Sequence, residues 1–199
     1  RAWSGGIYDE GRRGWLYPGA LNLAARDLYQ LERWNRLRIE AIGSSLRTWI
    51  NGVPVSHVID HLTPNGFLAL QVHSVGNQPG QAGRRILWRN LRIQTTDLVP
   101  SPADAIFVRN LIPNTVSEVE KAQGWRLLWD GATGAGWRGV NQTTFPAGGW
   151  TIEKGELSIS PPAKPEEKRA GGDIVTEELF GAFELALEFK ITPGANSGI

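Results

Sequence analysis

The chain has 199 residues, of which 41% are hydrophobic, so it can form a core, and its 24 glycines and 12 prolines favour short strands joined by tight turns. It has no cysteine, which excludes disulfides and thiolate metal sites, and only three histidines, which disfavours an all-histidine zinc site. A net charge of +1 argues against nucleic-acid binding, and no apolar run approaches the ~20 residues of a membrane-spanning helix.

Charge is unevenly distributed along the chain. Residues 1–94 carry 12 arginines and six acids, a net charge of +6, whereas residues 95–199 carry a net charge of −5. Opposite charges of this size would favour docking of the two parts. The nine tryptophans are also unusual. We expect most of them in the core and the others on a surface that meets a ligand.

The first predicted strands surround a turn. Residues 34–42 alternate polar and apolar side chains, as a half-buried strand does. The runs 46–50 and 53–55 flank Asn51-Gly52, a strong hairpin signal because a type I′ turn needs positive φ at both central residues. Two more strands are expected at 67–73 and 86–93, with a loop between Gly76 and Gly83.

The middle of the chain changes character. Residues 95–113 contain three prolines without a clear period and are predicted to be a linker. Asn114 or Thr115 could cap a short helix over 116–123, which Gly124 would end.

The strand pattern then resumes. Lys154-Gly155 predicts a second hairpin, and the segment 161–170 is predicted to be an exposed loop. The strands expected in this part are 125–129, 150–153, 156–160, 173–176 and 183–192, the last being the longest. The fold class is therefore all-β, a sandwich or jelly roll.

Ordered motifs cover the last 76 residues. They begin with Gly124-Trp125-Arg126-Leu127-Leu128-Trp129-Asp130-Gly131 and continue through 136–139, 149–157, 171–176, 183–189 and 193–199. Together they resemble the opening of a domain of the bacterial 3-keto-disaccharide hydrolase family. Ala182 departs from the family pattern, which usually has an acid at that position.

The start of the chain resembles the other end of the same domain. The motifs are 4–9 (Ser-Gly-Gly-Ile-Tyr-Asp), 34–39, 49–53, 66–73 and 88–93. The resemblance implies the C-terminal half of one domain at 1–94, a linker with a short helix at 95–123, and the N-terminal half of a second domain at 124–199. It also implies a concanavalin A-like jelly-roll sandwich, here incomplete or permuted, and a periplasmic or extracellular location. We expect the two half-domains to associate.

The resemblance implies a carbohydrate substrate oxidised to a ketone at carbon 3. The ketone acidifies the proton on carbon 2, so a base can remove it and the aglycone can leave from carbon 1 before water adds. Such a site needs a base, an acid for the leaving group and stabilisation of the enolate. We expect no cofactor and no metal, and we expect glycoside hydrolase or lyase activity if the parent protein is intact.

Three residues are predicted to be catalytic, and strand alternation places them. Phe67, Ala69, Gln71 and His73 would share one face of a strand, and Phe183, Leu185, Leu187 and Phe189 would face the core. Glu184 and Glu188 would then share the opposite face, roughly 13 Å apart. The catalytic candidates are His73, Glu184 and Glu188, and the substrate-binding candidates are Tyr8, Gln71, Asp173, Trp3 and Trp15.

Each candidate also has an ordinary structural interpretation. His73 could be a satisfied histidine at a strand end, and Glu184 and Glu188 could belong to a solvated face. Tyr8 and Asp173 could stabilise turns instead of binding sugar hydroxyls. His57 and His61 match no motif and are expected to have surface roles.

Two other classes of protein fit the same fold, since a sandwich serves binding and catalysis alike. One alternative is a carbohydrate-binding, lectin-like module without catalysis. The other is a structural domain of a larger secreted protein. Activity on a 3-keto-glucoside would distinguish the enzyme from the lectin-like module. Failure to bind any sugar would favour the structural domain.

Overall fold

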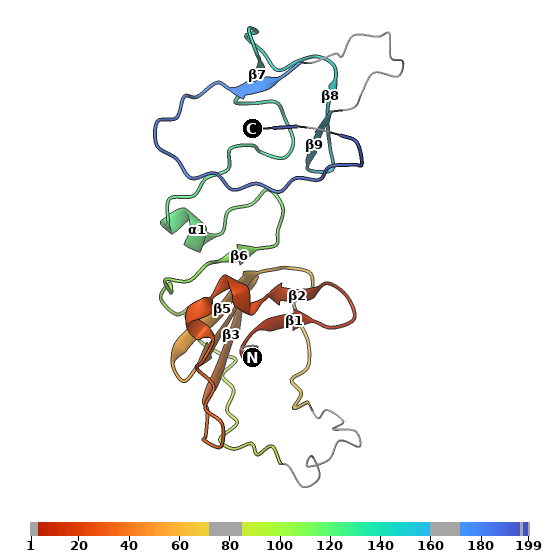
Figure 1. Ribbon diagram of the computed structural model, residues 1–199. Helices are drawn as coiled ribbons and strands as arrows, with labels where there is room; N and C mark the ends of the chain where they lie inside the picture. The colour runs from red at the N-terminus through yellow and green to blue at the C-terminus, as the bar shows by residue number, and fades with distance from the viewer. Residues whose placement is uncertain (1–3, 72–84, 160–171, 196, 199) are drawn as a thin grey trace. The chain divides into compact units, whose positions relative to one another are not determined.

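The computed structural model describes residues 4–71, 85–159, 172–195 and 197–198 (Figure 1). The chain divides into two compact units, Arg1–Leu127 and Leu128–Ile199, and each is described by itself. Within the described residues, no helix is long and apolar enough to cross a membrane.

Unit 1 contains a four-stranded sheet in the order β3-β4-β5-β6. Its strands are β3 (Leu37–Ile42), β4 (Ser45–Ile50), β5 (Val53–Ile59) and β6 (Arg109–Asn110). The predicted turn joins β4 to β5, with φ of 52° at Asn51 and 85° at Gly52, which confirms the hairpin. β5 and β6 pair in parallel, so part of the predicted linker belongs to the sheet.

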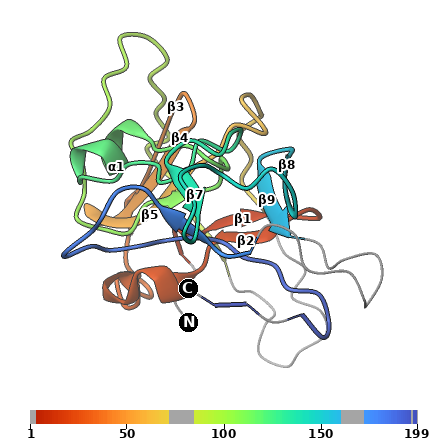
Figure 2. The same ribbon diagram turned by 90° about the horizontal axis from the view of Figure 1, so that it is seen from above.

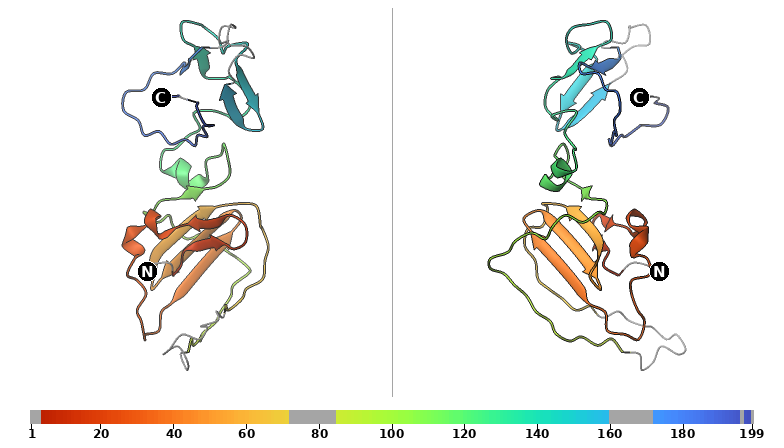
Figure 3. Two further views of the ribbon diagram at one scale, coloured as in Figure 1. Left: turned by 45° about the vertical axis from the view of Figure 1, so that its right-hand side comes forward. Right: turned by 90° about the vertical axis from the view of Figure 1, so that its left-hand side faces the viewer.

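A hairpin of β1 (Ile7–Asp9) and β2 (Gly14–Tyr17) covers one face of this sheet (Figure 3). Its buried side chains Ile7, Leu16 and Tyr17 pack with Val58 to form the core. The hydroxyls of Thr48 and Ser56, on the covered face, both donate to the carbonyl of Gly5, which ties the start of the hairpin to β4 and β5. Two short 3₁₀ helices, Gly19–Leu21 and Leu23–Ala25, follow β2.

The predicted short helix is present as α1 (Glu118–Ala122). Its cap is Ser117, not Asn114 or Thr115 as predicted. Ser117 and Glu120 form a capping box, in which each side chain binds the other's backbone N–H. Asn114 instead adopts a left-handed conformation with φ of 52°.

Unit 2 contains two separate pairs of strands. β7 (Trp137–Gly139) pairs with β10 (Ile174–Thr176). β8 (Trp150–Glu153) and β9 (Glu156–Ile159) form an antiparallel ribbon of their own (Figure 2). Lys154 and Gly155 lie in the turn between them with φ of 55° and 77°, which confirms the second predicted hairpin.

Four predicted strands do not form within the described residues. The segments 67–71, 86–93, 125–129 and 183–192 have no ladder partners. The predicted core-facing side of 183–189 is wrong, because Phe183 is 70% exposed and Phe189 is 78% exposed. An apolar alternating sequence becomes a strand only when a neighbour accepts its backbone hydrogen bonds and covers its apolar face.

The all-β class is confirmed, since most of the regular secondary structure is β-strand and the only α-helix in the described residues has a single turn. Unit 1 consists of two β layers, the hairpin and the four-stranded sheet. Association of the two half-domains stays a prediction.

Candidate functional site

Two neighbouring aromatic rings project from the β1–β2 hairpin of unit 1. Tyr8 lies opposite Trp15 in the ladder, and their ring centroids are 4.9 Å apart with an angle of 55° between the planes. Because side chains alternate along a strand, the neighbours Ile7, Asp9 and Leu16 point into unit 1, and the two rings point outward. Tyr8 is 52% exposed and Trp15 is 39% exposed, so the pair presents aromatic surface to solvent.

The turn of this hairpin is held by ion pairs. The carboxylate of Asp9 accepts hydrogen bonds from Arg12 Nε at 2.8 Å and Arg13 Nε at 2.7 Å. Arg13 also binds both oxygens of Asp60, at 3.2 and 2.6 Å, which ties the turn to the end of β5. The hydrogen bonds from Arg13 lower the pKa values of Asp9 and Asp60. These acids therefore stay ionised and paired, and they position the hairpin rather than act as bases.

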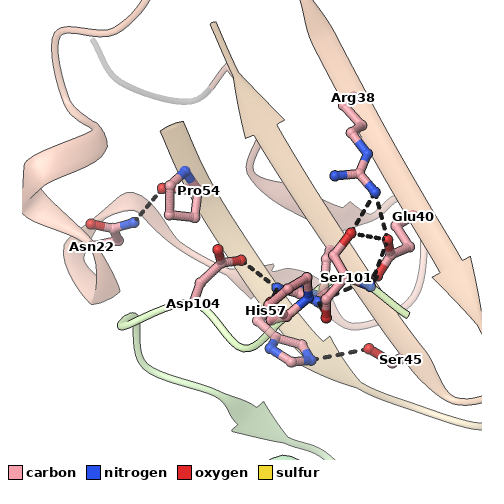
Figure 4. A network of polar contacts seen from close by, with 10 residues as sticks. Asn22, Arg38, Glu40, Ser45, Pro54, His57, Ser101 and Asp104 are labelled. Atoms are coloured by element: carbon pink, nitrogen blue, oxygen red, sulfur yellow. Dashed lines mark hydrogen bonds and ion pairs between the residues drawn. The ribbon is translucent and has the colours of Figure 1, made fainter. Parts of the chain in front are cut away.

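The face of the sheet opposite the hairpin carries a polar network (Figure 4). Glu40 of β3, Arg47 of β4 and His57 of β5 are neighbours across the ladder and share this face. Arg47 is only 3% exposed, and its guanidinium donates to Glu40, to the carbonyls of Ser101 and Pro102, and to the carboxylate of Asp104.

Aromatic and carboxylate groups complete this network. Arg38 donates to Glu40 at 2.7 Å and to the hydroxyl of Ser101 at 2.5 Å. The guanidinium carbons of Arg38 and Arg47 lie 4.4 and 4.8 Å from the ring centroid of Trp49, which is within cation–π range. The network thus concentrates two cations, one acid and an indole on one face of the sheet.

His57 is buried, which corrects the prediction of a surface role for this residue. Only 1% of it is exposed, and its Nε2 lies 3.0 Å from the hydroxyl of Ser45. Burial, together with the positive charge of Arg47, lowers the pKa of His57. His61 is exposed, as predicted.

The structure places the predicted site residues of unit 1 in different surroundings. Tyr8 and Trp15 are brought together as an exposed pair. Gln71 is exposed in an irregular segment. His73 and Trp3 lie outside the described residues.

In unit 2, Asp173 precedes β10 and its carbonyl accepts a hydrogen bond from the backbone N–H of Val140 at 3.0 Å, while its side chain is exposed. Glu184 and Glu188 are exposed on the irregular segment that follows β10. A shared surface for Gln71, His73 and the two glutamates stays a prediction.

The network on β3–β5 was not predicted from the sequence, although the positions of its charged residues on neighbouring strands indicated it. The turn at Gly43 and Ser44 places Arg47 opposite Glu40. The Asn51-Gly52 hairpin, with a register shift between Thr48 and Trp49, places it opposite His57. Charged residues on matching strand positions indicate a polar sheet face. Across the described residues, no group of three or more histidines, aspartates and glutamates could hold a metal ion.

Comparison with known proteins identifies the family. The family described as 3-keto-alpha-glucoside-1,2-lyase-like domain matches residues 1–94 and 124–199, the same two ranges that the motifs delimit. A relative from Bacteroides thetaiotaomicron, a 3-keto-disaccharide hydrolase, is 38% identical over 79 residues, which are 39% of this chain and 27% of that protein. The chain thus spans about a quarter of the length of this curated relative. With most of its residues matched, the chain belongs to the 3-keto-alpha-glucoside-1,2-lyase-like family.

Proposed function

We propose that this chain is part of a carbohydrate-active enzyme that cleaves 3-keto-glycosides. The observation that carries the proposal is the family match over residues 1–94 and 124–199. The name of the Bacteroides relative, a 3-keto-disaccharide hydrolase, supports the same substrate class. We also propose a concanavalin A-like jelly roll as the complete fold of the domain.

The proposed reaction depends on the ketone at carbon 3. A base removes the proton from carbon 2, and the electron pair forms an enolate with the ketone. The aglycone leaves carbon 1 and takes a proton from an acid, which gives an unsaturated keto-sugar. Water then adds across the double bond, so that the net products are the free 3-keto-sugar and the aglycone alcohol. Each proton transfer is general acid–base catalysis by a positioned side chain.

His73 and one of the glutamates Glu184 and Glu188 are proposed as the base and acid. Histidine changes its charge near neutral pH, which suits proton transfer in both directions. Gln71 and Asp173 are proposed to bind sugar hydroxyls.

The Tyr8–Trp15 pair is proposed as the platform that stacks on the sugar, because an exposed aromatic surface is otherwise costly to leave in water. Trp3, which precedes this hairpin in the sequence, is also proposed to stack on the sugar.

A test uses p-nitrophenyl 3-keto-glucoside and the full-length natural protein. We expect release of p-nitrophenol from this substrate and none from the matching glucoside with a hydroxyl at carbon 3. Cleavage of both at equal rates would indicate an ordinary glycosidase with two carboxylates. Binding without release would favour the lectin-like module.

The order of bond breaking can be read from the product. Elimination followed by hydration, run in heavy water, places deuterium on carbon 2, whereas direct hydrolysis leaves hydrogen there. His73→Ala and Glu188→Gln are each expected to abolish release of p-nitrophenol. Glu177→Gln, which removes the same charge from the same unit, is the control for Glu188→Gln and is expected to leave the release unchanged. Full turnover by His73→Ala would remove His73 from the mechanism.

A further inference from the structure

Residues 101–104, here called the strap, cross the polar face of the β3–β5 sheet. The backbone N–H and hydroxyl of Ser101 donate to Glu40, and the hydroxyl also accepts from Arg38. The carbonyls of Ser101 and Pro102 and the carboxylate of Asp104 all accept from Arg47, at 2.7, 2.6 and 2.6 Å. Figure 4 shows Ser101 and Asp104 directed at these groups.

The strap is held by polar groups and not by burial of apolar side chains. Pro102 and Ala103, its apolar residues, are exposed. Most protein segments that cross a sheet contribute apolar side chains to the core, because burial of apolar surface supplies most of the packing energy. The strap instead presents one hydroxyl, one carboxylate and backbone polar groups, which are the groups that a polar ligand would offer.

The charge of this face requires an anion. Arg38 and Arg47 face a single acid of the sheet, Glu40, and the second negative charge comes from Asp104 of the strap. A buried cation without a counter-charge is strongly destabilising, so whatever replaces the strap must also bring a carboxylate or similar anion. In addition, Arg47 Nε is buried and makes no hydrogen bond, so the strap leaves one donor of this site unused.

We propose that this face is a binding site for a carboxylate-bearing sugar, such as a uronic acid, and that the strap occupies it as an internal ligand. The carboxylate of the sugar replaces Asp104 on Arg47, and a sugar hydroxyl replaces Ser101 between Arg38 and Glu40. The sugar class rests on the proposed function, whereas the carboxylate rests on the Arg47–Asp104 ion pair. The strap lowers the apparent affinity for the ligand by keeping most molecules in the occupied state.

The test measures binding of D-glucuronate and D-glucose to the full chain by calorimetry. In the strap variant, Ser101→Ala with Asp104→Ala, we expect glucuronate to bind at least about tenfold more tightly than to the unmodified chain, because the variant lacks two charge-assisted competitors. Glucose affinity stays unchanged. Asp27→Ala, which removes one acid outside the network, is the control and gives no gain.

A second variant keeps the test decisive if Arg47 itself cannot be replaced without unfolding. The side chain of Arg38 is 54% exposed, so the fold should tolerate Arg38→Ala. When this substitution is added to the strap variant, we expect the gain in glucuronate affinity to disappear. No gain for glucuronate in the strap variant, or an equal gain for glucose, overturns the proposal. Loss of the glucuronate gain with 3-keto-glucoside cleavage intact removes only this second site and leaves the proposed function standing.

Discussion

Replacing Arg47 by methionine keeps an unbranched apolar stem and removes the guanidinium. Arg47 is buried and donates to four partners: Glu40, the carbonyls of Ser101 and Pro102, and Asp104. Removing one partner of a buried ion pair costs about 3–5 kcal/mol. Glu40 keeps Arg38 at 2.7 Å and the side chain of Asp104 is 20% exposed, so both acids remain partly compensated. We therefore expect the lower end of the range, about 3 kcal/mol.

The assay is hydrogen–deuterium exchange of the β3–β5 amides in the native state, which reports the free energy of opening of this sheet alone. Lys121→Met is the matched control, because the Lys121–Glu118 ion pair is exposed and such pairs contribute only about 0–1 kcal/mol. A loss below about 1 kcal/mol in Arg47→Met would show that the network adds little stability, and would refute the reasoning.

Two further predictions concern buried titratable groups. Tyr17 donates to the carbonyl of Phe107 at 2.9 Å, so Tyr17→Phe should lower the free energy of unfolding by about 1 kcal/mol in urea denaturation. Burial raises the pKa of Tyr17 to about 12, so the stability it contributes should decline as pH rises above 10, and Tyr17→Phe should remove this decline. Burial lowers the pKa of His57, so unfolding takes up a proton and stability should fall as pH drops below about 6.5. Thermal unfolding between pH 5 and 8 checks this, and an unchanged pH dependence in His57→Gln would contradict it.

Local turn chemistry made part of the fold predictable from sequence. Asn51-Gly52 and Lys154-Gly155 both form the expected hairpins, because each turn is specified within four residues. Asn and Gly favour the left-handed conformation that the turn needs, and Lys154 also adopts it beside Gly155. The cap of α1 was misplaced by two or three residues. Asn114, Thr115 and Ser117 all suit an N-cap, and both Thr115 and Ser117 have a Glu three residues later, so the sequence alone did not decide between them; the structure forms the capping box with Ser117 and Glu120.

Non-local pairing was not predictable in the same way. The segments 67–71 and 183–192 have strand-like alternation but no ladder partner, and β6 joins β5 in parallel across some 50 intervening residues. Whether an alternating segment becomes a strand depends on a neighbour that its own sequence does not encode. For the same reason the hydrogen bonds between Arg47 and the strap could not be predicted, whereas Glu40, Arg47 and His57 lie on strands that adjacent turns join.

The part of the candidate site that is built from residues close together in the sequence was predictable. Tyr8 and Trp15 were expected at a sugar-binding surface, and they form one exposed pair because β1 and β2 are adjacent in sequence. The burial of His57 was not predictable from its own strand alone, since its side chain lies beside Ser45 and Arg47 of the neighbouring strand β4.

The measurement that tests the account most directly is the affinity of methyl 3-keto-glucoside for the chain and for two tryptophan variants. Trp15→Ala removes half of the proposed stacking platform, while Trp34→Ala removes another exposed indole that has no proposed role. Loss of aromatic stacking of about 1 kcal/mol, together with lost buried area, should weaken binding by about tenfold in Trp15→Ala and leave Trp34→Ala unchanged. Equal affinity of the unmodified chain and both variants would contradict the assignment of the Tyr8–Trp15 pair to the sugar.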